Sequence, residues 1–195
     1  MAFSRLRRSG VFIVATFVLV SACGPRYSDQ DIAAASQRLS HLYDLRNYEI
    51  GMQEGRQWQD AGPRAFEPRA WFVLNTARYS QSEDLSDSTV AWGEAMTKQA
   101  PDNPWAWFAL AAALNNHRSR GEEALAASDS MMRLGSGISF LRLRDDVLRD
   151  QVSDSAGLAF LDSLAPAVQK NPVLLVRRGV DEFYRGMASH DDSLI

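Results

Sequence analysis

PRAWFVLNTA at residues 68–77 and PWAWFALAAA at residues 104–113 are identical at six of ten positions, and they lie 36 residues apart. The dipeptide Asn103-Pro104, at the start of the second segment, recurs as Asn171-Pro172, 68 residues later and thus two steps of 34. Asparagine is a favoured helix N-cap, and proline is tolerated in the first helical turn because its missing N–H is not needed there. The two segments predict a helical unit that recurs about every 34 to 36 residues.

The rest of the chain also has the apolar spacing of helices. Ile32, Ser36 and Leu39 follow one another at steps of four and three, and no long alternating run of β-branched residues is found, so the expected fold class is all-α. Short breaks rich in glycine, proline and asparagine separate the helical segments. The expected helix pairs are residues 31–44 with 47–61, 68–80 with 84–100, 104–117 with 121–134 and 138–150 with 154–169, followed by a lone helix at 172–187.

The paired helices and their period resemble the tetratricopeptide (TPR) repeat, whose pattern begins Trp-x₂-Leu-Gly-x₂-Tyr. Trp71-x₂-Leu74 and Trp107-x₂-Leu110 match the start of that pattern. Its glycine and tyrosine are replaced here, by Asn75 and Arg78 in the first segment and by Ala111 and Leu114 in the second. The resemblance implies a right-handed superhelix of about four and a half helix-turn-helix repeats over residues 31–195. A closed helical bundle built from the same helices is the alternative.

Two further expectations follow from the repeat. Small residues near Gly51, Ala91 and Ala124 belong on the second helix of each pair, where they would let two helices approach closely. At the other end, the repeat stops halfway, since helix 172–187 is apolar along one half and no capping helix follows it. We therefore expect that the chain continues past Ile195, or that a second copy or a partner covers the open end.

The N-terminus predicts export. Residues 1–10 contain three arginines and no acid, and residues 11–20 form an apolar run that only Thr16 interrupts. This is the order of a secretory signal peptide, and the run is too short to span a bilayer as a helix. We therefore expect a signal peptide over residues 1–22 that is removed from the mature protein.

The segment Val20-Ser21-Ala22-Cys23 resembles the lipobox of bacterial lipoproteins. The resemblance implies a diacylglyceryl thioether on Cys23 and a lipidated tether over residues 23–30. Because Gly24, and not aspartate, follows the cysteine, it further implies the periplasmic face of the outer membrane where the cell has one. In a cell without an outer membrane, the expected location is the outer face of the cytoplasmic membrane.

Composition argues against several function classes. Loss of residues 1–22 removes three arginines and no acidic residue, so the mature chain has 18 basic and 24 acidic residues. An acidic protein of this kind is not expected to bind nucleic acid. Cys23 is the only cysteine, which leaves no thiol for a disulfide or for catalysis. His41, His117 and His190 have no second ligand at a zinc-like spacing, and no phosphate loop or nucleophile elbow is found. The sequence predicts no catalytic site, no metal and no cofactor.

In TPR arrays the first helix of each repeat tends to line the concave groove, so the resemblance implies a partner-binding surface on these helices. Aromatic rings and adaptable amides suit peptide capture, because the rings bury much area at a low entropic cost. The expected groove residues are Arg69, Phe72, Tyr79, Trp105, Phe108, Asn115 and Asn116. Trp71 and Trp107 are assigned to packing between helices. Because no lysine lies on these helices, a lysine clamp for a terminal carboxylate is not expected.

Together these features predict a non-catalytic envelope lipoprotein that acts as a protein-interaction scaffold through a TPR-like groove. Its expected partners are a protein or peptide and, through the lipid on Cys23, the membrane; self-association through the last helix is also considered. The alternative is that the chain is the N-terminal helical part of a longer exported enzyme, for example with a thioredoxin-like or hydrolase domain after it.

Overall fold

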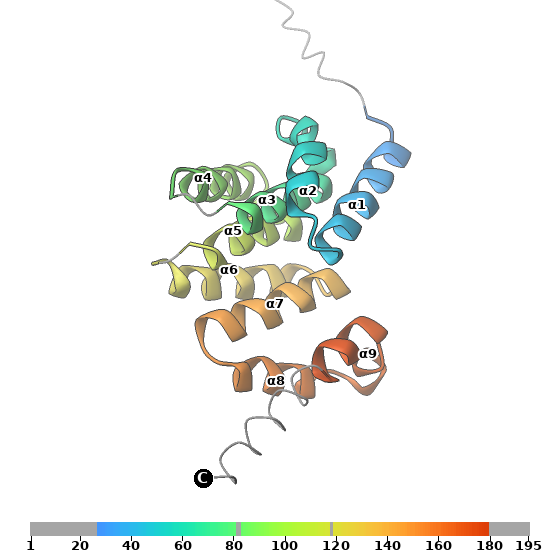
Figure 1. The fold of residues 1–195 in the computed structure, drawn as a ribbon, viewed down its shortest axis with the longest axis vertical. Coiled ribbons are helices and arrows are strands. Elements are labelled where there is room, and N and C mark those ends of the chain that lie inside the picture. The colour runs from blue at the N-terminus through green and yellow to red at the C-terminus, as the bar shows by residue number, and fades with distance from the viewer. Residues whose placement is uncertain (1–26, 81–82, 118, 180–195) are drawn as a thin grey trace, which may run out of the picture.

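The computed structural model describes residues 27–80, 83–117 and 119–179, and these residues form helices and no strand (Figure 1). The predicted all-α fold class is thereby confirmed for this part of the chain. The signal peptide, Cys23 and the end of the predicted last helix lie outside it. None of the described helices is both long enough and apolar enough to cross a membrane. In chain order the elements are α1 (Asp29–Asp44), α2 (Tyr48–Gly55), η1 (Arg56–Trp58), η2 (Pro63–Ala65), α3 (Phe66–Tyr79), α4 (Glu83–Gln99), α5 (Pro104–Asn115), α6 (Gly121–Leu134), α7 (Ile138–Gln151), α8 (Asp154–Ser163), α9 (Pro166–Gln169) and a last helical stretch at residues 172–179.

Polar caps fix the starts of two helices. Ser28 Oγ accepts a hydrogen bond from the Asp31 N–H at 3.1 Å, and the Asp31 carboxylate accepts one from the Ser28 N–H at 2.9 Å. Asn103 Oδ1 accepts from the Trp105 N–H at 2.9 Å, with Pro104 in the first turn. Both helices start within two residues of the predicted positions, because the capping signals are local in the sequence.

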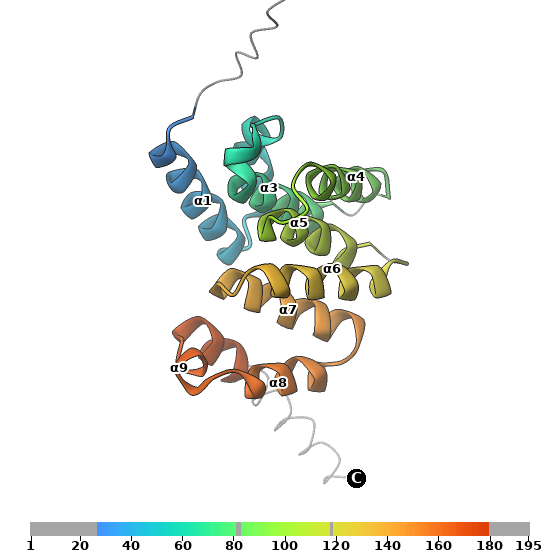
Figure 2. The same ribbon diagram turned by 180° about the vertical axis from the view of Figure 1, so that it is seen from behind.

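The helices stack as pairs. α1, α3, α5 and α7 form a row in which each helix contacts the next, and α2, α4 and α6 each pack against the row helices before and after them (Figures 1 and 2). α8 packs on α7 at the end of the stack. The predicted pairing of neighbouring helices is therefore present, while the superhelical twist implied by the TPR resemblance stays a prediction.

Glycines allow the close contacts between successive pairs. A Cβ at Gly93 of α4 would lie 2.7 Å from the Leu110 Cα of α5, and one at Gly51 of α2 would lie 2.4 Å from the Asn75 side chain of α3. Each contact joins the second helix of one pair, α2 or α4, to the first helix of the next pair, α3 or α5. Ala91, which the sequence analysis places at this position on α4, is exposed, so the small contact position lies two residues later at Gly93. Gly51 and Ala124 are buried as expected.

The core is centred on α3, the helix that carries the first of the two matching segments. Every residue from Ala70 to Ala77 is buried, because α1, α2, α4 and α5 all contact this helix. Trp71 lies against Phe108 with 5.2 Å between ring centroids, and Phe108 lies 6.0 Å from Phe140. These rings link α3, α5 and α7 across three successive pairs and confirm the assignment of Trp71 to packing.

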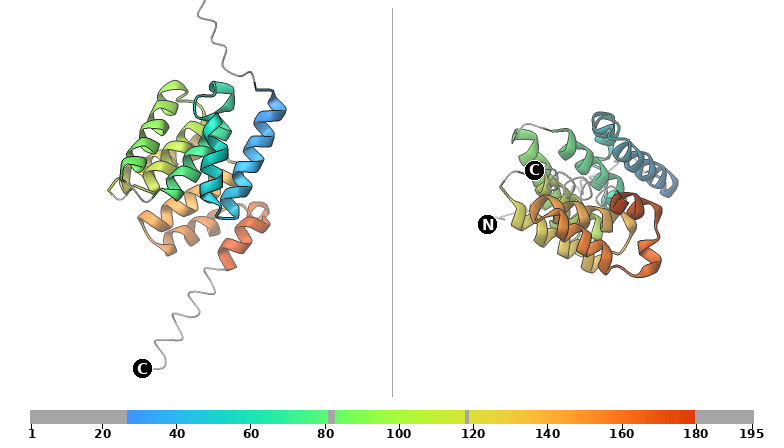
Figure 3. Two further views of the ribbon diagram at one scale, coloured as in Figure 1. Left: turned by 45° about the horizontal axis from the view of Figure 1, so that its top comes forward. Right: turned by 60° about the horizontal axis from the view of Figure 1, so that its bottom comes forward.

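The second helix of the first pair and that of the last pair are shorter than predicted. α2 ends at Gly55 and continues as a 3₁₀ turn to Trp58, where the sequence predicts helix as far as residue 61. The predicted helix 154–169 is interrupted after Ser163, because Pro166 holds the preceding Ala165 in an extended conformation with ψ of 143°. The break turns the chain so that residues 172–179 lie beside the C-terminal end of α1 and not in line with α8 (Figure 3).

Candidate functional site

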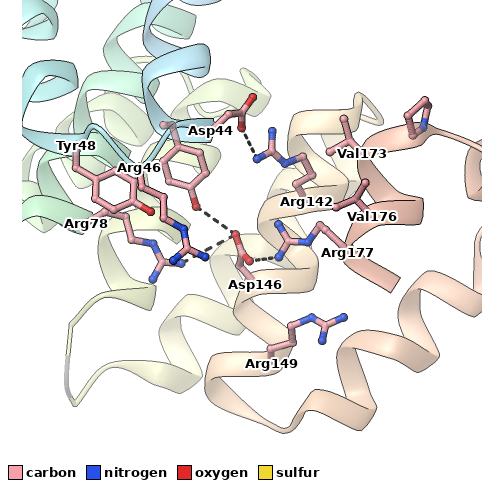
Figure 4. A pocket seen from close by; sticks show the side chains of 12 residues that line it. Asp44, Arg46, Tyr48, Arg78, Arg142, Asp146, Arg149, Val173, Val176 and Arg177 are labelled. Carbon is pink, nitrogen blue, oxygen red and sulfur yellow. Dashed lines mark hydrogen bonds and ion pairs between the residues drawn. The ribbon is translucent and has the colours of Figure 1, made fainter. Parts of the chain in front are cut away.

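An open pocket of about 750 Å³ lies where the α1–α2 turn, the end of α3, α7 and residues 172–179 meet (Figure 4). Four stretches of chain that are far apart in the sequence therefore build it. Five of its lining residues are arginines and two are tyrosines. The lining residues are Tyr43, Asp44, Arg46, Tyr48, Arg78, Arg142, Asp146, Arg149, Pro172, Val173, Val176 and Arg177.

The α1–α2 turn places Arg46 in the pocket at a conformational cost. Helix α1 ends in a Schellman motif, in which the Arg46 N–H bonds the Tyr43 carbonyl at 3.0 Å and the Asn47 N–H bonds the Leu42 carbonyl at 2.9 Å. Arg46 has φ of 58°, and no other non-glycine residue of the described chain has a positive φ. Glycine is the usual residue at this position, and a side chain there costs about 1 kcal/mol. The guanidinium of this strained residue points into the pocket (Figure 4).

Two adjacent aspartates of α7 tie the last helical stretch to the pocket wall. Asp145 has no exposed surface and accepts hydrogen bonds from Arg149 Nε and Arg177 Nε, each at 2.8 Å. The second aspartate, Asp146, accepts from Arg177 Nη2 and, at 3.4 Å, from the Tyr43 hydroxyl. One guanidinium thus bridges both carboxylates and connects α7 to residues 172–179.

Two further arginines of the pocket, Arg78 and Arg142, form longer ion pairs or leave a donor unpaired. Arg78 lies 3.6 Å from an Asp150 oxygen and 4.0 Å from an Asp146 oxygen, distances that are charge contacts and longer than hydrogen bonds. Arg142 pairs with Asp44 at 2.5 Å, but its buried Nε has no hydrogen-bond partner within the described part of the chain. The pocket therefore holds guanidinium donors that its own acids do not fully use.

The phenol of Tyr43 lies among charged groups in a buried part of the pocket. Burial raises the pKa of Tyr43 to about 12, the neighbouring Asp146 charge adds to the increase, and Arg78 opposes it. A tyrosine with this pKa stays protonated at neutral pH. It can therefore donate its O–H to Asp146 and still present its ring to the guanidinium of Arg142, which lies 5.8 Å from the ring centroid.

Phe72 and Phe108, two of the predicted groove residues, are largely buried. Phe72 is buried and stacks on Trp92 of α4 with 5.3 Å between ring centroids. Phe108 is also buried, in the row of rings that joins α3, α5 and α7. Phe108 is therefore a core residue and does not line a groove, whereas Phe72, although buried, lines a small pocket together with Arg69.

Both tryptophans of α5 pack against the core, as assigned for Trp107 but not as expected for Trp105. Trp105 is half-buried, with its ring 4.7 Å from Phe140 and 5.2 Å from Phe108, so it extends the aromatic core. Trp107 is also half-buried, and its indole N–H donates to the Pro101 carbonyl at 2.7 Å. Trp105, expected to face a groove, thus makes more ring contacts than Trp107.

The other predicted groove residues are scattered. Arg69 donates to Gln99 at 3.2 Å and lines a separate pocket of about 210 Å³ between α3 and α4. Tyr79 is exposed at the end of α3. Asn115 is buried and donates to Asp150 at 2.7 Å. The neighbouring amide, Asn116, bonds the carbonyl one turn earlier in its own helix, and none of the seven predicted residues lines the large pocket.

The histidines do not form a centre. His117 Nε2 lies 3.1 Å from Asp87 Oδ1 at the end of α5, His41 is exposed on α1, and His190 lies outside the described residues. Across residues 27–80, 83–117 and 119–179, no three histidine, cysteine or acidic side chains are grouped as metal ligands.

Comparison with known proteins gives no further guide to the site. The chain matches no protein-family model, and neither a curated protein nor a solved structure shows significant similarity to it. The functional interpretation therefore depends on the pocket and on the sequence features described above.

Proposed function

We propose that the protein is a non-catalytic binding scaffold that holds a segment of a partner protein in the arginine- and tyrosine-lined pocket. This differs in place from the groove that the TPR resemblance implies on the first helices. The observation that carries the proposal is Arg46, a side chain held in a costly left-handed conformation where glycine would fit and directed into an open pocket. Backbone strain of this kind is often kept at functional sites.

The size and chemistry of the pocket support binding of a peptide segment. A volume of about 750 Å³ is within the usual range of about 300–1,000 Å³ for ligand sites. Tyrosine and arginine are the residues that contribute most often to the energetic centres of protein interfaces. The paired helices hold the four contributing stretches of chain in contact, which reduces the entropic cost of binding.

The N-terminal sequence supports a location for this scaffold. The basic segment, the apolar run and the lipobox-like end at Cys23 together favour a lipoprotein of the cell envelope. In this proposal, residues 23–30 tether the helical part to a membrane, and the partner is another envelope protein or an exported peptide.

Selection from a random peptide library tests the proposed function. Peptides should be enriched on the purified protein, and the enrichment should be lost on the Arg46→Gly variant, which removes the side chain but suits the backbone. Arg38→Gln is the matched control, because Arg38 is an arginine of the same helix pair that forms an exposed ion pair with Glu54, outside the pocket. No enrichment, or equal enrichment on the wild type and on Arg46→Gly, would contradict the function.

A further inference from the structure

The pocket carries an excess of positive charge in an acidic chain. Five arginines but only two aspartates, Asp44 and Asp146, line it. The lining therefore has more basic than acidic side chains, whereas the whole chain has a formal charge of −3. A local charge opposite to the net charge favours an anionic ligand and disfavours a cationic one.

The excess lies at the Arg46–Arg78 end of the pocket. No ion pair involves Arg46 within the described residues, and the ion-pair contacts of Arg78 are longer than hydrogen bonds. Both side chains point toward the region beside Asp146 in Figure 4. Arg177 and Tyr43 already bind this carboxylate, so it does not saturate the two arginines. Arg46, which forms no ion pair within the described residues, and Arg78, which contacts Tyr43 besides its long ion pairs, together are suited to bind a carboxylate of a ligand.

The opposite wall presents apolar side chains beside Arg142 and Arg177. These are Pro172, Val173 and Val176, and the valines expose 40% and 66% of their surface. Figure 4 shows both valines across the pocket from Arg46 and Tyr48. An occupant that covered these side chains would remove apolar surface from water, which is favourable. The pocket therefore has a cationic end and an apolar end within one volume.

We infer that the pocket binds an acidic–apolar peptide segment, with a side-chain carboxylate at Arg46 and Arg78 and an aliphatic side chain on Val173 and Val176. This inference rests on the proposed function and specifies the chemistry of the partner. One segment can supply both groups, since the two ends belong to one pocket. A terminal carboxylate is not required.

Capped peptides test the inference. The probes are acetylated and amidated hexapeptides in which leucine follows glutamate by one to four residues, each with a twin that has glutamine in place of glutamate. The best glutamate peptide should bind the wild-type protein about tenfold more tightly than its twin, as expected for one charge-assisted hydrogen-bonded contact. This difference should decrease as salt is raised, because the contact is partly exposed.

Variants test which end of the pocket binds each side chain of the peptide. Arg46→Gly should abolish the preference for glutamate over glutamine, while Arg38→Gln should keep it. Val176→Asn should weaken the leucine peptide but not a version with alanine in place of leucine, and since Val176 is largely exposed this change should leave folding intact. Equal binding of the glutamate and glutamine peptides, or a preference that survives in Arg46→Gly, would overturn the inference.

The two proposals fail in different ways. If library selection yields peptides that need Arg46 but contain no acidic residue, the charge inference is wrong and the scaffold function stands. If selection on the wild-type protein yields no peptide at all and the capped probes do not bind, the scaffold function itself is contradicted.

Discussion

Arg177 Nε donates a hydrogen bond of 2.8 Å to Asp145 Oδ2, and so joins the last helical stretch to α7 through a carboxylate with no exposed surface. Leu174 is buried in an apolar cluster with Leu141 of α7 and Leu161 of α8, while Leu175 and Val176 expose 48% and 66% of their surface. Residues 172–179, and with them one wall of the pocket, are therefore held by this apolar contact together with the ion pairs to α7.

Replacing Asp145 should detach this wall. Asp145→Asn leaves Arg149 and Arg177 without their buried charged partner, which we expect to cost about 3 kcal/mol of unfolding free energy. Amide hydrogen exchange should increase in residues 172–179 more than in α3. Urea denaturation and exchange mass spectrometry measure the two effects.

The matched control for this change is Asp162→Asn. Asp162 forms an exposed ion pair with Arg178 at 3.2 Å, and exposed pairs contribute about 0–1 kcal/mol. If the two asparagine variants lose the same stability, or if exchange in residues 172–179 does not change in Asp145→Asn, the buried pair does not hold the last stretch.

The hydroxyl of Tyr43 should lose its proton at a higher pH than an exposed tyrosine. Its pKa in the folded protein is about 12, mainly because of burial and also because of Asp146, compared with about 10 in an unfolded chain. The ultraviolet difference between the wild type and Tyr43→Phe should therefore show phenolate formation centred near pH 12. If the difference between the two proteins instead shows phenolate formation near pH 10, the Tyr43 hydroxyl is exposed to solvent.

The same shift makes stability depend on alkaline pH. A folded pKa above the unfolded value means that the stabilising contribution is fully present below about pH 10 and is lost as pH rises through about 12. The wild type should lose up to about 2 kcal/mol of unfolding free energy relative to Tyr43→Phe across that window. Parallel curves for the two proteins from pH 9 to pH 12 would contradict the assignment.

The helix contacts at glycine are also testable. Gly93→Ala would place a methyl group 2.7 Å from the Leu110 Cα, so α4 must shift, and we expect a loss of about 1–3 kcal/mol. Gly62→Ala is the matched control, because nothing lies within 4 Å of the added Cβ and its φ of −65° suits alanine. Urea midpoints compare the two, and an equal effect would mean that α4 and α5 do not need this close approach.

The lipid anchor has its own test. Intact-mass analysis of the mature protein from a bacterial host should show a diacylglyceryl modification, and Cys23→Ser should remove it and release the protein from membranes. An unmodified wild-type mass would contradict the lipoprotein assignment without affecting the argument about the pocket.

Most helix positions could be predicted because their signals are local. Asn103 with Pro104 and Ser28 with Asp31 mark helix starts within a few residues of sequence, and the structure uses both. The interruption of the last pair could also have been found, since Pro166 stands inside the predicted helix and restricts Ala165. The contact position at Gly93 was assigned to Ala91 because an average repeat period does not determine which face of α4 meets α5.

The pocket could not be predicted in this way. Its residues come from stretches near positions 43, 78, 142 and 172, and nothing in the local sequence shows that these approach one another. The Arg46-Asn47 break marks the end of α1 but not the left-handed conformation of an arginine, a position that glycine normally occupies. The aromatic residues instead suggested a groove, although Phe72 and Phe108 have the same spacing whether they face a partner or the core.

The location of a bound ligand tests the central claim most directly. Backbone and arginine side-chain resonances of the isotopically labelled protein can be followed by NMR while the best capped glutamate–leucine peptide is added. We predict that Arg46, Tyr48 and Val176 shift in a saturable way, while Arg69 and Tyr79, which the sequence places in a TPR-like groove, do not. Saturable shifts at Arg69 and Tyr79, with none around Arg46, would show that the partner binds the first-helix surface and would contradict the pocket as the binding site.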